Sequence, residues 1–243
     1  MPGLYEEIIL WSGLLCALAI VVVCLRTRCF AQYYILCIYL LSNVAFTLGC
    51  YYVIHAYGYD SDEYLYFYYT GDAIVTVLNY LLIGSFFNYV LRHSVFHKYV
   101  QLTIFFFFVG VVIVSGIFIS GSVDRFYSSW VIEFEQNMYF VGVLLTFLLW
   151  MTITYLGAET RRFALLVSGM GVFFAAHAAN YAIRSLFPSL SALTLIVPPL
   201  AYNFMVGLWL YTFLWVPEEE VAVQPARQVF QRLAPVGAHS LRK

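Results

Sequence analysis

The stretch that decides the fold is residues 8–25, IILWSGLLCALAIVVVCL, which is followed directly by Arg26-Thr27-Arg28. It carries no charged residue, and a hydrocarbon core of roughly 30 Å requires a helix of about 20 mostly apolar residues. The segment is too long and too uniformly apolar for a barrel strand of about 10 alternating residues. We therefore predict a membrane-spanning helix that ends at the basic turn.

Six further segments have the same character, and short separators between them hold nearly all the charge. The sequence therefore predicts an all-α, polytopic membrane protein with a bundle of seven transmembrane helices. The expected spans are Ile8–Leu25, Phe30–Ile54, Tyr64–Leu91, Tyr99–Ser120, Asn137–Leu156, Phe163–Ile183 and Leu190–Val216. We expect one bundle over residues 1–216 and a flexible cytoplasmic tail over residues 217–243.

The composition of the whole chain agrees with this reading. Of 243 residues, 63% are hydrophobic and 10% charged, and the mean hydropathy is +0.84. A soluble domain carries about 25% charged residues, so these proportions exclude a soluble globular enzyme and a disordered chain. The formal net charge of −1 offers no basic face, so we expect no nucleic-acid partner.

Basic residues predict the orientation, because lysine and arginine are enriched in cytoplasmic loops. Ten of the 12 bases fall on one side: Arg26, Arg28, Arg92, Lys98, Arg161, Arg162, Arg227, Arg232, Arg242 and Lys243. Most acids fall on the other side: Glu6, Glu7, Asp60, Asp62, Glu63, Asp124, Glu133 and Glu135. We therefore expect an outside N-terminus, a cytoplasmic C-terminus and Asp72 as the one charged residue well inside a span.

The N-terminus and the cysteines point to a retained first helix and a bundle without disulfides. Residues 2–7 include Glu6 and Glu7 and no base, so the positive region of a cleavable signal peptide is missing. All five cysteines lie in the first two spans or the turn between them: Cys16, Cys24, Cys29, Cys37 and Cys50. No CxxC pair occurs, so we interpret them as small apolar packing residues.

Polar side chains inside the spans fall on helix faces. The third span places Asp72, Thr76 and Asn79 on one face, because they are spaced i, i+4 and i+7. The sixth span does the same with a second set, and the second and seventh spans add one asparagine each. These further candidates are His177, Asn180, Arg184, Asn43 and Asn203.

Two interpretations of this polar group are open. In the structural one, Asp72 pairs with Arg184 and the asparagines bridge helices, each bond contributing on the order of 0.6 kcal/mol. In the functional one, the group lines an outward-facing cavity for a ligand, a proton or an ion, as intramembrane polar residues often do. Pro198 and Pro199 interrupt the seventh helix at a similar depth, either beside such a cavity or as a packing kink.

A ridge of small residues follows the sixth span and lets another helix approach closely. It consists of Gly171, Ala175, Ala178 and Ala182. We expect it to form a packing seam, either within the bundle or towards a membrane-protein partner or a second copy of the chain.

Several chemistries are excluded or weakly supported. A retinal Schiff base needs a lysine within the seventh helix, and the chain has lysines only at 98 and 243. His177 is the single histidine well inside a span, which disfavours a bis-histidine haem, and no acidic metal cluster or HExxH motif occurs. We expect no cofactor and no metal.

A Ser-His pair deserves a separate test. Ser115 and His177 lie at matching depths in the fourth and sixth spans, and this distantly resembles the dyad of the rhomboid intramembrane proteases. Rhomboids carry a glycine two residues before the serine, where this chain has Ile113. An intramembrane serine hydrolase is therefore a weakly supported hypothesis for the function.

A second resemblance covers roughly the first 95 residues. The run Leu10-Trp11-Ser12-Gly13-Leu14-Leu15, the arginine-bearing turn before the second span, and Tyr64–Asp72 with Leu91-Arg92 closing the third span carry it. The pattern resembles an uncharacterised family of small multi-pass bacterial inner-membrane proteins. The resemblance implies a bacterial inner-membrane location and no transferable activity.

The absence of a catalytic constellation and the short loops favour a non-enzymatic protein. We expect a sensor, an assembly factor or a subunit of a membrane complex. The alternative is a small-solute or ion transporter that uses the outward-facing polar cavity.

Overall fold

The computed structural model describes residues 4–92, 97–117, 126–156, 161–187 and 191–217, and every element in these ranges is helical. The seven long helices are α1 (Leu4–Arg26), α2 (Tyr34–Tyr57), α3 (Asp62–Leu91), α4 (His97–Ile117), α5 (Phe126–Leu156), α6 (Arg161–Leu186) and α7 (Ser191–Trp215). Each contains a stretch long and apolar enough to cross a membrane, as predicted. The predicted tail from residue 218 onward lies outside the described residues.

At two helix boundaries, a single residue determines where the helix begins. The second span was expected from Phe30, but residues Cys29–Ala31 form a separate 3-10 turn, η1, and α2 starts at Tyr34. Arg28 precedes that turn in the left-handed conformation (φ 58°), which an α-helix cannot include. At α3, the Ser61 hydroxyl accepts a hydrogen bond from the Tyr64 amide at 3.2 Å and caps the helix.

The fifth helix corrects the predicted boundaries most. Its span was expected to begin at Asn137, with Glu133 and Glu135 in a loop, but α5 begins at Phe126 and includes both residues. Glu135 is buried, with 4% of its surface exposed. The expectation that Asp72 is the one charged residue well inside a span is therefore wrong.

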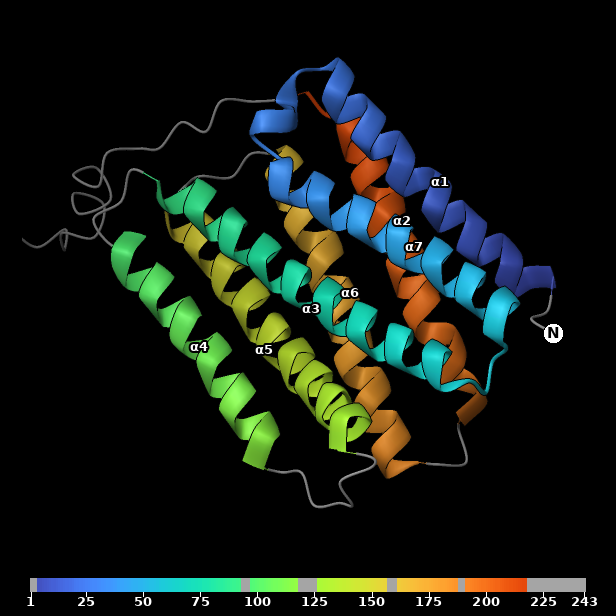
Figure 1. The fold of residues 1–243 in the computed structure, drawn as a ribbon. Coiled ribbons are helices and arrows are strands. Elements are labelled where there is room, and N and C mark those ends of the chain that lie inside the picture. Colours follow the sequence, from blue (N-terminus) through green and yellow to red (C-terminus); the bar gives the residue numbers. More distant parts are fainter. Residues whose placement is uncertain (1–3, 93–96, 118–125, 157–160, 188–190, 218–243) are drawn as a thin grey trace, which may run out of the picture.

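Six helices form a closed ring, and α4 lies outside it. Contacts run from α1 to α2, α3, α5, α6, α7 and back to α1, while α4 packs on α3 and α5 (Figure 1). Close approach within the ring relies on glycine: a Cβ on Gly49 or Gly142 would lie 2.4 Å from the ring of Phe67 or Phe174. These two positions fix the α2–α3 and α5–α6 contacts.

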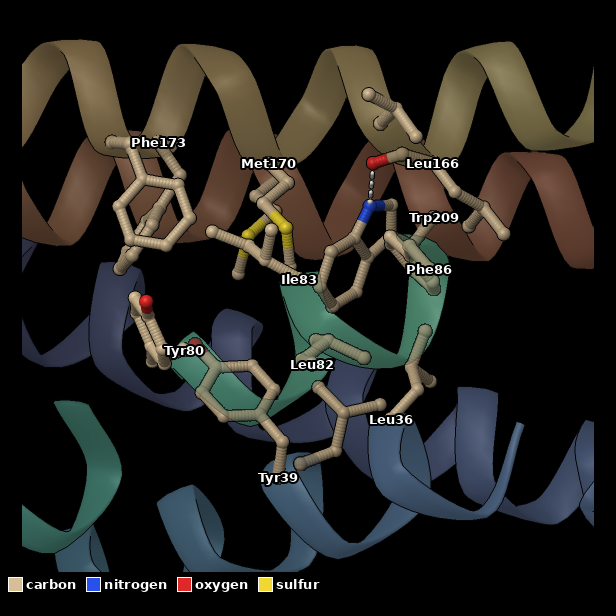
Figure 2. Packing of buried hydrophobic residues seen from close by; sticks show 14 of the residues in the cluster. Leu36, Tyr39, Tyr80, Leu82, Ile83, Phe86, Leu166, Met170, Phe173 and Trp209 are labelled. Carbon is tan, nitrogen blue, oxygen red and sulfur yellow. Dashed lines mark hydrogen bonds between the residues drawn. The ribbon is translucent and has the colours of Figure 1, made fainter. Parts of the chain in front are cut away.

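The apolar core fills the ring towards the end where α1 and α3 finish and α6 begins, which we call the basic end. Trp209 of α7 is fully buried there, and its indole N–H donates to the Leu166 carbonyl of α6 at 2.9 Å (Figure 2). Large apolar side chains such as Leu15, Ile117 and Phe147 are exposed on the outer surface. Apolar side chains exposed on the outer surface of a packed bundle are expected for helices that face lipid.

Candidate functional site

A cavity of about 270 Å³ lies at the centre of the ring. All six ring helices contribute to its wall and α4 does not. We call it the central cavity; its lining residues are Leu10, Leu14, Asn43, Phe46, Thr47, Asp72, Val75, Asn79, Tyr139, Phe173, His177, Pro198, Pro199, Tyr202 and Asn203. Ligand pockets begin at about 300 Å³, so this space suits a small solute.

Five of the eight candidate residues from the sequence line this cavity: Asn43, Asp72, Asn79, His177 and Asn203. They come from α2, α3, α6 and α7. Their spacing along each helix and their similar depth therefore correctly predicted that they lie together. Both prolines of α7 also line the cavity, and the Pro199 carbonyl accepts a hydrogen bond from the Asn203 amide.

The other three candidates lie away from the cavity wall. Thr76 is buried next to it, and its hydroxyl has no hydrogen-bond partner among the described residues. Asn180 is half-buried with an unpartnered Oδ1. Arg184 is exposed in the last turn of α6.

The Asp72–Arg184 ion pair of the structural interpretation is not present among the described residues. Asp72 faces a different partner. The carboxyl groups of Asp72 and Glu135 lie within hydrogen-bonding reach of each other, and we call them the carboxyl pair.

Glu135 is the functional candidate that sequence reasoning missed. Its Oε2 accepts a hydrogen bond from the Tyr181 hydroxyl at 2.9 Å, while its Oε1 is buried without a partner. A signal for it exists: Glu135 continues the buried face of α5 that Met138, Tyr139 and Gly142 mark at i+3, i+4 and i+7. Hydropathy alone predicts that the span begins at Asn137, so it does not reveal that the helix extends back through Glu135.

Asn203 and Asn79 differ sharply in how their amides are used. The Asn203 amide donates to the Ile9 and Pro199 carbonyls and accepts from Ser12, all at 2.9 Å, so it joins α1 to α7. Asn79 is 1% exposed, and neither its Oδ1 nor its Nδ2 makes a well-formed hydrogen bond among the described residues, although the Tyr39 hydroxyl of α2 lies within reach of the amide. Buried polar atoms are usually paired, so Asn79 has spare hydrogen-bonding capacity at the cavity wall.

His177 is held firmly by its surroundings. Its ring stacks on Tyr139 with centroids 4.5 Å apart and lies 4.2 Å from the Phe173 ring. Nδ1 lies 2.9 Å from the Phe173 carbonyl oxygen, which makes Nδ1 the protonated nitrogen. The remaining nitrogen, Nε2, is the one that can bind a cavity ligand.

Two other expected features lie apart from this site. Ser115 is buried and its hydroxyl accepts a hydrogen bond from the Asn137 amide at 3.0 Å, so it is engaged by α5 and not by His177. In the small-residue ridge of α6, Ala178 is buried, Ala175 is exposed, and a Cβ on Gly171 would lie 3.9 Å from Thr146 of α5. Gly171 thus packs within the bundle.

A larger cavity of about 900 Å³ lies at the basic end, between the start of α2, the end of α3 and the start of α4. Its polar lining residues are Gln32, Tyr34, Ser85, Asn88, Tyr89, Arg92 and Gln101. Asn88, Arg92 and Gln101 are exposed, so this is a surface hollow outside the ring. The central cavity, which is formed by all six ring helices and lined by a carboxyl, an imidazole and a buried amide, is the stronger candidate site.

Comparison with protein-family models, with curated proteins and with solved structures finds no match to this chain.

Proposed function

We propose that this protein is a small-solute or ion transporter whose binding site is the central cavity. The observation that carries the proposal is the meeting of Asp72, His177 and the buried Asn79 amide at the wall of one cavity in the centre of the ring. The Asn79 amide makes no well-formed hydrogen bond among the described residues, whereas the Asn203 amide is fully bonded. A solute with a donor and an acceptor would complete the hydrogen bonding of Asn79.

Other features of the cavity support the same function. Asp72 supplies charge, His177 supplies a free ring nitrogen, and Phe46, Tyr139 and Phe173 supply aromatic walls. Pro198 and Pro199 remove two backbone N–H donors from α7 beside the cavity, and interrupted helices at membrane depth are typical of transporter binding sites.

The proposal includes a location and an orientation. The basic end carries Arg26, Arg92 and Arg161, and we place it in the cytoplasm of a bacterial inner membrane, with the N-terminus outside. Asp72 and His177 then lie in the half of the bundle nearer the outer surface. This orientation makes the cavity accessible first to solutes from outside.

The test is uptake into proteoliposomes. Purified protein is reconstituted and offered a radiolabelled panel of amino acids, sugars, small amines, Na⁺ and K⁺. We expect uptake of at least one class, its loss in Asp72→Asn and His177→Ala, and its retention in the matched control Arg184→Ala. No uptake of any panel member by a correctly folded protein contradicts the proposal.

A second candidate is the non-enzymatic sensor, assembly factor or subunit. The observation that favours it is α4, which among the described helices packs mainly on α3 and α5 and leaves an apolar cavity of about 450 Å³ against α5. A partner helix or a second copy of the chain seated there, or on the exposed Ala175 edge of α6, would support it. Mild-detergent purification tests this candidate, which a stable partner supports and a partner-free monomer contradicts.

A further inference from the structure

The carboxyl pair joins two helices of the ring beside the central cavity. Asp72 of α3 lines the cavity, whereas Glu135 of α5 lies behind it and is 4% exposed. The Tyr181 hydroxyl already occupies Glu135 Oε2, so the unpartnered Oε1 is the oxygen available for Asp72. Two carboxyl groups in contact need one hydrogen between them to form a hydrogen bond.

The groups around the pair provide no positive charge to hold two carboxylates. The titratable groups that interact electrostatically with one or both carboxyls are Tyr39 and Cys50 of α2, Tyr68 of α3, Tyr139 of α5 and Tyr181 of α6, and His177 of α6 lines the same cavity as Asp72. Within the described part of the chain, neither carboxyl forms an ion pair with an arginine or a lysine. Two adjacent negative charges in a water-poor interior repel strongly, and carboxyl dyads within hydrogen-bonding reach of each other retain one proton.

We propose that Asp72 and Glu135 share one proton, and that this proton exchanges with the central cavity through Asp72. In the protonated state the pair carries one negative charge and a hydrogen bond that satisfies Glu135 Oε1. Release of the proton to the cavity leaves two carboxylates, a state that needs a positive charge in the cavity. The site is thus a proton-binding site next to a solute site.

The chemistry favours a proton over a metal ion. The Tyr181 hydroxyl donates to the pair, whereas a metal would need further acceptor oxygens there. In the described residues no group of three or more His, Cys, Asp or Glu side chains is arranged to hold a metal. A second and independent feature, the buried Asn79 amide that makes no well-formed hydrogen bond among the described residues, marks the adjoining cavity as a place for a polar ligand.

The role of this proton as a coupling ion rests on the proposed transport function, but its presence does not. It can be tested with dicyclohexylcarbodiimide, an apolar reagent that modifies protonated carboxyl groups. The full-length protein is labelled in detergent between about pH 6 and pH 9, where exposed carboxyl groups are ionised. Mass spectrometry of peptides then locates the modified residue.

We expect labelling of Asp72 or Glu135 near neutral pH, with a decline as the pH rises. In Asp72→Asn and Glu135→Gln the introduced amide donates to the remaining carboxylate and removes the need for a proton. Labelling of the remaining carboxyl should fall about tenfold, the change that corresponds to 1.4 kcal/mol. Glu133→Gln, on the same helix, is the matched control and should label as the wild type does.

Three results would overturn the inference. One is absence of labelling in the wild type near neutral pH, which means that both carboxyls are ionised. Another is undiminished labelling of the remaining carboxyl in both single variants, which means that each is protonated independently. The third is suppression of wild-type labelling by Na⁺ but not by choline at constant pH, which assigns the pair to a metal cation. The pH and Na⁺ series use only wild-type protein, so they hold even where a variant fails to fold.

The outcome is independent of the transport assay. Labelling without solute uptake would leave the proton site in place and reject the proposed function. Uptake without labelling would reject the proton site and leave the proposed function in place.

Discussion

Replacing Asn79 by leucine should stabilise the protein and abolish its function. The two buried polar atoms of the Asn79 amide make no well-formed hydrogen bond among the described residues, although the Tyr39 hydroxyl lies within reach, and a buried polar atom left unsatisfied costs roughly 1–3 kcal/mol. Leucine has a similar shape and no polar atoms. Because the cavity offsets part of that cost, we expect the free energy of unfolding to rise by about 1–3 kcal/mol in Asn79→Leu.

The matched control is Asn203→Leu, at the same cavity. The Asn203 amide makes three hydrogen bonds, and intramembrane bonds of this kind average about 0.6 kcal/mol each. Their loss should lower the free energy of unfolding by about 2 kcal/mol. The two substitutions are chemically identical and should therefore shift stability in opposite directions.

Denaturation in detergent micelles measures both variants, with the fluorescence of the tryptophans, including buried Trp209, as the signal. Uptake in proteoliposomes measures the function, which we expect Asn79→Leu to lose. A fall in stability of Asn79→Leu comparable to that of Asn203→Leu would refute the reasoning. It would show that the Asn79 amide bridges helices and that its role is structural.

Three further predictions concern packing and unused groups. Gly142→Ala should destabilise the bundle by about 1–3 kcal/mol, because its Cβ would lie 2.4 Å from the Phe174 ring, whereas Gly110→Ala has open space and should be neutral in the same denaturation assay. Arg184→Ala should leave both stability and carbodiimide labelling unchanged, since Arg184 is exposed and has no ion pair with the carboxyl pair; altered labelling would restore the predicted ion pair. A fluorophosphonate should leave Ser115 unlabelled because that hydroxyl is buried and bonded to α5, and a labelled Ser115 peptide would revive the hydrolase hypothesis.

Hydropathy and helix periodicity predict much of this protein because membrane helices obey simple rules. Runs of apolar residues determine the number of spans, and all seven expected helices are present. Spacing of i, i+4 and i+7 also brought Asp72 and Asn79 to one face, at the depth of His177. These predictions hold because each depends on one helix at a time.

What the sequence does not reveal depends on two or more helices together. Glu135 was assigned to a loop because Glu133, Glu135, Gln136 and Asn137 read as a polar boundary, although tertiary packing extends α5 through them. The positions of Arg184 and Asp72 near one end of the bundle suggest an ion pair between them. Depth alone, however, does not determine where a long side chain points. Only the assembled ring shows which carboxyl Asp72 faces.

The most direct test of the central claim is a proton flux driven by a solute. Proteoliposomes containing the pH-sensitive dye pyranine are exposed to the same solute panel, and the internal pH is followed. We predict that at least one solute changes the internal pH with the wild type and with Arg184→Ala, and that none does so with Asp72→Asn. An Asp72→Asn response equal to that of the wild type, or no response from a wild type that takes up solute, would contradict the account.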